Sequence, residues 1–376
     1  MSAIVKNPFF VAAYHSPAYF CDREKETKRV TGALTNGRNL TLLSARRIGK
    51  TGLIKNAFYQ LQKKKDWQTL YVDIMPTDNL NDFIKLLGKA VVEHEWRHSK
   101  SYLKKIATLL SGISAKLSFD SITGAPEIGV EYKTRQESEK SLSEIFHYLS
   151  AQDVKYAVAF DEFQQITCYP EKNMEALLRS YIQQMSNVNF IFSGSNKHLL
   201  TSMFSDYGRP FYQSSDFLFL EKIEAKAYCR FICEKFAKHG KSIAPELTKE
   251  ALEYYRVHTF YVQYFFNKLF ERCEKTVTKA LVEQMHRLIL EEREYIYYSY
   301  RNLLTPYQFL LLKAIAREGG ISQPNASDFI AKHSLKQSSS VNRALAALAD
   351  REMVYEESGV YYVYDVFFSK WLAKNF

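Results

Sequence analysis

The triplet Gly49-Lys50-Thr51 is the first feature of this chain that could do chemistry. It follows the apolar run 39–44 and opens a pattern in which apolar residues recur every three or four positions, as on one face of a helix. A turn from strand to helix presents unpaired backbone N–H groups at the positive end of the helix dipole, where anions bind. Lys50 adds a charge for the β- and γ-phosphates of a nucleotide, and the Thr51 hydroxyl can ligate Mg²⁺. We expect the residues of this loop to contact the phosphates: Ser44, Ala45, Arg46, Arg47, Ile48, Gly49, Lys50, Thr51 and Gly52.

Alternatives stay open within this loop. The usual phosphate-loop pattern opens with glycine where this chain has Ser44, and a positive φ at a serine would be strained. Arg46 and Arg47 suit either phosphate or an acidic partner. The other interpretation of the whole motif is a chance Gly-Lys-Thr on an exposed helix.

Asp161 and Glu162 end the buried strand predicted at 155–160. A carboxylate in that place can hold Mg²⁺ through water, opposite Thr51. Glu162 can orient or deprotonate an attacking water, a role worth about 10²–10⁴ in rate. The alternative is a solvated acidic pair. Because the chain has no guanine-reading Asn-Lys-x-Asp sequence, the two motifs together predict an ATPase that uses ATP/ADP and Mg²⁺.

Two further positions have two possible roles each. Ser195 follows the strand predicted at 188–193, where it can lie beside the γ-phosphate, while the alternative is that Ser195 or Asn196 caps a helix. Arg209 can reach a nucleotide as an arginine finger, or form a structural salt bridge.

Strand and helix patterns alternate up to about residue 222, and the strands are continuously apolar. This predicts an α/β fold, a parallel sheet covered on both faces. The range 115–133 alternates about a turn at 123–126 and predicts a hairpin, while the basic stretch before it, up to residue 110, predicts more helix. The chain is wholly helical from 224 to about 302, and then follows the order helix, helix, helix, hairpin of a winged helix. The expected domains are an ATPase core (1–222), a helical lid (223–303) and a winged helix (304–376).

With these motifs the chain resembles the archaeal-type ATPases of the AAA+/STAND superfamily, which also occur in Bacteroidetes-type bacteria. The resemblance covers about residues 20–372 and rests on SARRIGKTGLI, AFDEFQQI, FIFSGSNKHLLTSMF, RPFY, HTFYVQ and VYDVFFSKWL. It implies a P-loop NTPase sheet of the AAA+ type with a lid and a winged helix, acting as an ATP-driven switch.

The same resemblance assigns roles near the base. The family's amino-terminal Phe-x-Gly-Arg-Glu box corresponds to 20–24, which implies that Phe20 and Arg23 lie near the nucleotide, with Asp22 replacing the glycine. The lid's Gly-His-Pro-Tyr-Tyr corresponds to 257–261, which implies a contact from His258, although Thr259 replaces the proline.

The net charge of +10 is concentrated near the phosphate loop, because residues 1–66 hold 13 Lys/Arg against 4 Asp/Glu. An anionic ligand is therefore favoured over nucleic acid as the explanation of the charge. No apolar run reaches about 18 residues, so we expect no membrane span and a cytoplasmic protein. The five scattered cysteines do not form a disulfide pattern.

Partners beyond the adenine nucleotide stay open. The winged helix, 304–376, carries 8 basic and 7 acidic residues, and its wing holds Glu356 and Glu357. A duplex binder neutralises several phosphates, so an intramolecular role or docking to an unknown protein partner is favoured over DNA binding. The alternative functions are an ATP-licensed DNA-binding protein, resembling origin-recognition initiators or mobile-element ATPases, and a nucleotide-binding scaffold with little turnover.

Overall fold

The computed structural model describes residues 5–98, 115–119, 126–130 and 134–376. The chain forms two compact units, which are described separately. One is Ala13–Lys222; the other joins the N-terminal residues up to Ala12 to Ile223–Phe376. The predicted ATPase core, 1–222, includes that N-terminal stretch, whereas in the structure the stretch packs with the helices of the second unit.

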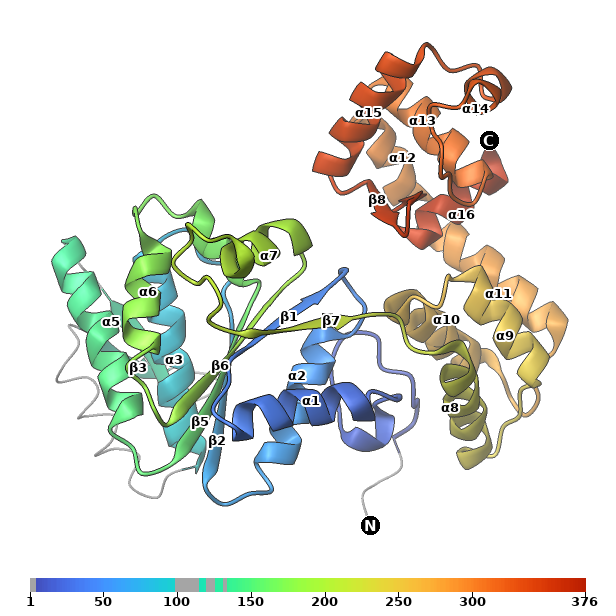
Figure 1. Ribbon diagram of the computed structural model, residues 1–376. Helices are drawn as coiled ribbons and strands as arrows, with labels where there is room; N and C mark the ends of the chain where they lie inside the picture. The colour runs from blue at the N-terminus through green and yellow to red at the C-terminus, as the bar shows by residue number, and fades with distance from the viewer. Residues whose placement is uncertain (1–4, 99–114, 120–125, 131–133) are drawn as a thin grey trace. The chain divides into compact units, whose positions relative to one another are not determined.

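The first unit is built on a five-stranded parallel sheet in the order β2-β5-β6-β1-β7, which confirms the predicted α/β fold (Figure 1). Because all five strands run the same way, their carboxyl ends meet at one edge, where ligands bind in sheets of this kind. The strands are β1 (Leu40–Ser44), β2 (Trp67–Asp73), β5 (Lys155–Asp161), β6 (Val188–Gly194) and β7 (Asp216–Leu220).

Side chains that alternate along the strands build one apolar core on each face of the sheet. In β5, Ala157 and Ala159 face one core, while Tyr156, Val158 and Phe160 face the other. Small residues on the first face admit α1 (Glu24–Thr35) and α2 (Lys50–Leu61). The aromatic face is covered by α3 (Leu80–His98), α5 (Arg135–Ser150), α6 (Met174–Ile182) and α7 (Lys197–Ser205).

Shorter elements complete this unit. Two 3₁₀ helices, η1 (Pro17–Tyr19) and η2 (Phe163–Cys168), precede α1 and follow β5. The predicted hairpin is present as β3 (Ala115–Phe119) paired antiparallel with β4 (Pro126–Val130). Its predicted turn residues 123–125, and most of the basic stretch up to residue 110, lie outside the described residues.

From Ala225 to Asn302 the second unit is built of helices, as the sequence pattern predicts. Phe9 of the N-terminal stretch is buried against the rings of Phe236, Phe266 and Phe270. Asn7 and Asn267 reinforce this contact: the Asn7 side-chain amide donates to the Asn267 carbonyl, and Asn267 donates to the Phe9 carbonyl. The helices are α8 (Ala225–Lys238), α9 (Pro245–Tyr254), α10 (Thr259–Arg272), α11 (Lys279–Glu292) and α12 (Glu294–Asn302).

The C-terminal part has the element order of a winged helix, as predicted, followed by one more helix. Its packing on the lid centres on Phe367, whose ring contacts those of Tyr255, Tyr261 and Tyr264. The elements are α13 (Pro306–Arg317), α14 (Ser327–Lys332), α15 (Ser338–Asp350), β8 (Val354–Glu357), β9 (Val360–Val363) and α16 (Val366–Asn375).

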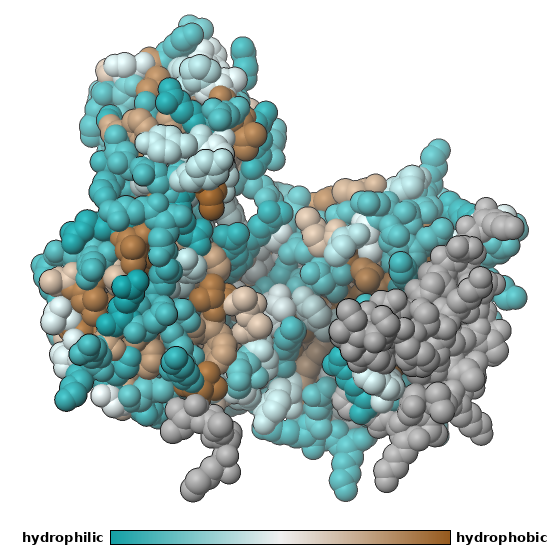
Figure 2. All heavy atoms as spheres, turned by 180° about the vertical axis from the view of Figure 1, so that it is seen from behind, coloured by the Kyte–Doolittle hydropathy of each residue, from teal (hydrophilic) through white to brown (hydrophobic). Residues whose placement is uncertain are grey.

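The surface is polar in character. Hydrophilic residues predominate over the face that Figure 2 shows, and apolar residues form small patches between them. Within the part of the chain that the structure describes, no helix combines the length and the apolarity needed to cross a bilayer.

The lid contains a histidine that makes its stability depend on pH. His286 is stacked on Phe265, and its Nδ1 lies 2.7 Å from the Tyr255 hydroxyl. Burial, together with the charge of Lys370, lowers the pKa of His286 to about 4. The unfolded chain, in which a histidine titrates near pH 6.5, therefore binds the proton first as the pH falls. We expect the second unit to keep its full stability above pH 6.5 and to lose up to about 3 kcal/mol between pH 6.5 and 4.

Denaturant unfolding followed by circular dichroism at several pH values checks this expectation. His286→Phe keeps the ring packing and removes the titrating group, so its stability should fall less steeply over the same pH range. An equal acid loss in wild type and variant would contradict the assignment to His286.

Candidate active site

The loop between β1 and α2 has the shape that anion binding requires. Gly49 (φ 108°) and Arg47 (φ 63°) adopt the left-handed conformation, and α2 starts at Lys50 with no side-chain cap. The first N–H groups of α2 therefore face the loop. The strain considered at Ser44 does not arise, because Ser44 is the last residue of β1 and the positive φ values fall later in the loop.

Lys50 joins the two predicted motifs. Its ammonium lies 3.1 Å from Asp161 Oδ1 and 2.9 Å from Glu162 Oε1, and its side chain is nearly buried. The Thr51 hydroxyl donates to Asp161 Oδ2 at 3.0 Å. The structure thus brings the pair Lys50 and Thr51 together with the pair Asp161 and Glu162, which follows 110 or more positions later in the sequence.

Asp161 accepts hydrogen bonds on both of its oxygens. Besides Lys50 and Thr51, the Tyr71 hydroxyl donates to Oδ2 at 2.5 Å and the Ser193 hydroxyl donates to Oδ1 at 2.6 Å. Burial alone would raise the pKa of Asp161, but the Lys50 charge and these hydrogen bonds together lower it. Asp161 is therefore ionised at neutral pH and available to a cation.

Glu162 is held in a similar way at the turn after β5. Oε1 accepts from Lys50, and Oε2 accepts from the Ser195 N–H at 3.0 Å, the Ser195 hydroxyl at 2.9 Å and the Gln164 amide at 2.7 Å. Burial opposes ionisation, but Lys50 and these donors lower the pKa of Glu162 below its ordinary value. In this arrangement the carboxylate is a weak base, because its negative charge is stabilised by four donors.

The donor set fits Mg²⁺ rather than a softer metal. Thr51 and Asp161 offer hydroxyl and carboxylate oxygens side by side, and Mg²⁺ is typically bound by one or two such groups together with water and substrate phosphates. In the described ranges, no group of three or more His, Cys, Asp or Glu side chains could hold a metal by itself.

Sequence reasoning missed three residues of this site: Tyr71, Asp73 and Gln164. Asp73 ends β2 in register with Asp161, and burial, with the nearby charges of Asp161 and Glu162, raises the pKa of Asp73. A signal for Asp73 was available, because the apolar stretch 69–75 predicts a buried strand and polar groups near the carboxyl ends of parallel strands share one edge. The contact of Tyr71 with Asp161 depends on the register of β2 against β5. Gln164 had no such signal, because its direction depends on the turn at Glu162 (φ 54°).

The predicted N-terminal box lies against the phosphate-loop helix. A Cβ on Gly52 would come within 3.1 Å of the Phe20 ring, so the absence of a side chain at Gly52 admits this ring. Asp22 (φ 55°) and Arg23 (φ 77°) are both left-handed, which explains why the family's pattern has glycine at the position of Asp22. Arg23 is buried and pairs with Glu26 at 2.9 Å, and it also donates to the Glu221 carbonyl.

Arg46 and Ser195 connect the loop to the end of β6. The Arg46 guanidinium Nε donates to the Ser195 hydroxyl at 3.3 Å, and Ser195 in turn holds Glu162. Of Ser195 and Asn196, the two residues considered for capping the next helix, Asn196 does so, because its side chain accepts from the Leu199 N–H.

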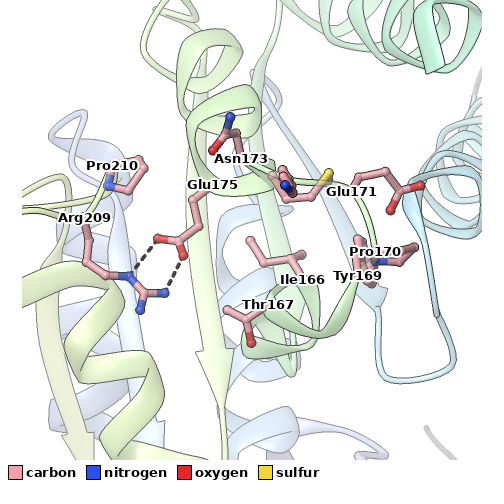
Figure 3. Close-up of a pocket in the computed structure, with 11 residues that line it drawn as sticks. Ile166, Thr167, Tyr169, Pro170, Glu171, Asn173, Glu175, Arg209 and Pro210 are labelled. Atoms are coloured by element: carbon pink, nitrogen blue, oxygen red, sulfur yellow. Dashed lines mark hydrogen bonds and ion pairs between the residues drawn. The ribbon is translucent and has the colours of Figure 1, made fainter.

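Arg209 forms an ion pair in this structure, the second of the two roles considered for it. Its guanidinium donates to both carboxylate oxygens of Glu175, with the Nε–Oε2 distance at 3.2 Å (Figure 3). Both residues line a cavity of about 480 Å³ between η2 and α6, together with Ile166, Thr167 and Glu171. An arginine-finger role stays a prediction.

His258 belongs to the second compact unit, where it precedes the first residue of α10. It is buried, and its ring packs against Tyr261 with centroids 4.8 Å apart. Its predicted contact with the nucleotide stays a prediction.

The Arg209–Glu175 pair gives a test that separates its two roles. We expect Arg209→Ala and Glu175→Ala to destabilise the first unit, with a coupling free energy of about 1 kcal/mol in a double-mutant cycle. Chemical denaturation of the four proteins measures this coupling. A coupling near zero, combined with slower ATP hydrolysis in Arg209→Ala alone, would favour the finger role instead.

Comparisons with known proteins agree with this geometry. Residues 20–258 match a family described as an ATPase domain predominantly from Archaea, and residues 295–374 match one described as a probable winged helix domain. Among curated proteins, none matches this sequence.

Solved structures share the fold at low sequence identity. The Walker-type ATPase Paby2304 of Pyrococcus abyssi is 17% identical with a TM-score of 0.66, covering 97% of this chain and 99% of its own. The ORC2 protein of Aeropyrum pernix, solved as ADPNP-ADP complexes, is 14% identical with a TM-score of 0.63, covering 98% of this chain and 95% of its own. The ORC1 protein of the same organism, solved in complex with DNA, is 12% identical with a TM-score of 0.55, covering 98% and 97%.

The match to the ATPase family, over residues 20–258, covers well over half of the chain and contains every residue of the phosphate loop and the Asp161-Glu162 pair. The chain therefore belongs to the family of ATPase domains found predominantly in Archaea.

Proposed function

We propose that this protein binds ATP with Mg²⁺ and hydrolyses it to ADP and phosphate, using Lys50, Thr51, Asp161 and Glu162. The observation that carries the proposal is the position of Lys50, whose ammonium contacts both carboxylates directly beside the open N-terminus of α2. In this site the backbone N–H groups of the loop and Lys50 bind the β- and γ-phosphates. Thr51 and Asp161 would hold Mg²⁺, which would stabilise the negative charge of the phosphates.

Glu162 acts on the attacking water. The oxygen of that water bonds to the γ-phosphorus while the bond from phosphorus to the β–γ bridging oxygen breaks, and ADP leaves. The proton of the water passes to Glu162 and then to solvent. Binding of phosphates draws Lys50 toward them, which weakens the main charge that lowers the pKa of Glu162, so substrate binding itself makes Glu162 a better base.

Two variants separate binding from chemistry. Lys50→Ala should weaken ATP binding by about 10- to 100-fold, because a charge-assisted contact to phosphate is lost. Glu162→Gln should keep ATP affinity and lower turnover by about 10²-fold or more, because an amide cannot accept the proton. Isothermal titration calorimetry measures the first effect and phosphate release measures the second.

Lys63→Ala is the matched control, since Lys63 follows the same helix and, among the described residues, interacts with Gln60 and the Tyr59 ring at the surface. Circular dichroism confirms that each variant is folded. Unaltered ATP affinity in a folded Lys50→Ala protein would remove the basis of the proposal.

The reaction serves, in this proposal, as a switch. Nucleotide state sets the position of the lid and winged helix through residues such as His258. The packing of Phe367 among Tyr255, Tyr261 and Tyr264 supports a lid and winged helix that respond together. The partner that responds to the change is proposed to be a protein.

A second candidate function is ATP-licensed DNA binding, and one feature of α15 favours it. Its first two turns expose Ser338, Ser339, Asn342 and Arg343, which are hydrogen-bonding side chains at the start of a helix. The near-neutral charge of the module and the two wing glutamates oppose strong duplex affinity.

DNA binding is checked by fluorescence anisotropy of a labelled duplex at about 50 and 200 mM salt, with ATP or ADP present. If this candidate holds, affinity falls steeply with salt and Arg343→Ala weakens it several-fold. Lys374→Ala, at the far end of α16, removes the same charge from the same module and should change little. No binding at the lower salt concentration would eliminate DNA as a partner.

A further inference from the structure

Gln164 lies within the site without an assigned role. It is the second residue of η2, and its side-chain amide donates to Glu162 Oε2 at 2.7 Å. If the nitrogen and oxygen of the amide were exchanged, the carbonyl oxygen would face a carboxylate oxygen, and two acceptors cannot form a hydrogen bond. The nitrogen of the amide therefore faces Glu162.

The two oxygens of Glu162 have different surroundings. Oε2 accepts three hydrogen bonds, from Gln164 and from the N–H and hydroxyl of Ser195, whereas Oε1 has Lys50 as its partner. The backbone at Glu162 is left-handed, so the strand direction of β5 does not itself determine where the carboxylate points. The donors on Oε2 therefore fix the carboxylate and direct Oε1 toward the phosphate-binding lysine.

The Gln164 side chain packs directly against the backbone of Gly194, the last residue of β6. A Cβ on Gly194 would lie 2.1 Å from Gln164 Oε1 and 3.2 Å from its Cδ. Gly194 is not at a positive φ, so its backbone conformation does not demand glycine. The space left by the missing side chain is filled by the amide of Gln164.

One atom of this arrangement is poorly satisfied. Gln164 Oε1 is buried and has no hydrogen-bond partner among the described residues. A buried carbonyl without a donor is unfavourable, and such groups in folded proteins call for an explanation. The amide nitrogen donates to Glu162 while the amide oxygen stays without a donor. This placement therefore orients the Glu162 carboxylate at a cost to the stability of the folded protein.

We propose that Gln164 is a positioning residue for ATP hydrolysis: its amide, seated over Gly194, holds Oε2 of Glu162 so that Oε1 faces the attacking water. This inference rests on the proposed ATPase function. It predicts that loss of the amide leaves ATP binding intact, because the side-chain hydrogen bond of Gln164 goes to Glu162 and not to the phosphate loop. The rate of the chemical step falls, because Glu162 samples orientations in which Oε1 does not reach the water.

The test compares matched substitutions at neighbouring glutamines of η2. Gln164→Met keeps the length of the side chain and removes the donor. Gln165→Met is the control, since the Gln165 amide donates to the Thr77 carbonyl at 2.8 Å and not to Glu162. Single-turnover hydrolysis of radiolabelled ATP gives the rate of chemistry, and calorimetry gives the affinity for ATP.

We expect Gln164→Met to slow the single-turnover rate about tenfold or more while its affinity for ATP stays within about twofold of wild type. Gln165→Met should match wild type in both measurements. A role limited to the stability of η2 would affect both variants alike and would lower the melting temperature rather than the rate.

Gly194→Ala supplies independent support, because the added methyl displaces the amide while Gln164 is retained. Its loss of rate should resemble that of Gln164→Met, and the double variant should be little slower than either single one, since both changes remove the same contact. A normal rate in Gln164→Met would overturn the inference and leave the ATPase function standing. Absence of hydrolysis by the wild-type protein, with ATP and Mg²⁺ present, would overturn both.

Discussion

One ammonium group keeps both carboxylates of the site in their ionised form. Lys50 lies between two carboxylates that follow each other in the chain, and the side chains of Lys50 and Asp161 are almost withdrawn from solvent. Buried carboxylates without a cation would take up protons, because burial penalises the charged form. The ionised state of Asp161 and Glu162 therefore depends on Lys50, and so does the presence of an anionic oxygen beside Thr51. A ligand that competes for Lys50 changes the electrostatics of both acids at once.

The sequence predicted much of this site because parallel strands impose it. Once β1, β5 and β6 are assigned as buried strands of one sheet, their following residues must meet at the carboxyl edge, and Lys50, Asp161 and Ser195 are brought together by topology alone. What the pattern could not supply is the direction of side chains across neighbouring strands. Tyr71 reaches Asp161 because β2 pairs with β5 in a register that places Asp73 opposite Asp161, and register is a property of the folded sheet. Gln164 depends on a left-handed turn at Glu162, for which a glutamate gives no sequence signal.

Backbone conformation explains where this chain departs from familiar motifs. Ser44 can replace a glycine because β1 continues through it, so a normal side chain meets no conformational barrier there. Asp22 shows the opposite case, since it does adopt a positive φ, and aspartate is one of the few residues besides glycine that tolerate this conformation. A motif glycine can therefore be replaced in two situations. Either the positive φ occurs at another residue of the loop, as with Ser44, or the replacing residue tolerates a positive φ, as with Asp22.

The turn before His258 also has residues at positive φ, and its contacts link the lid to the winged helix. Arg256 and Val257 are both left-handed, and for a β-branched valine this conformation is unfavourable. The turn is held by Arg256, whose guanidinium donates to the Val363 carbonyl at 3.2 Å and to the Ser369 hydroxyl at 2.8 Å. It also lies over the Tyr362 ring, 4.8 Å from the centroid.

These partners of Arg256 belong to β9 and α16, so the winged helix stabilises the conformation of a lid turn. The strained conformation of this turn is maintained by contacts with residues outside the turn, and the strain is released when those contacts are lost. Any change that moves His258 must therefore either carry β9 and α16 with it or break the contacts of Arg256. The lid turn and the winged helix are therefore coupled through Arg256 within the second compact unit.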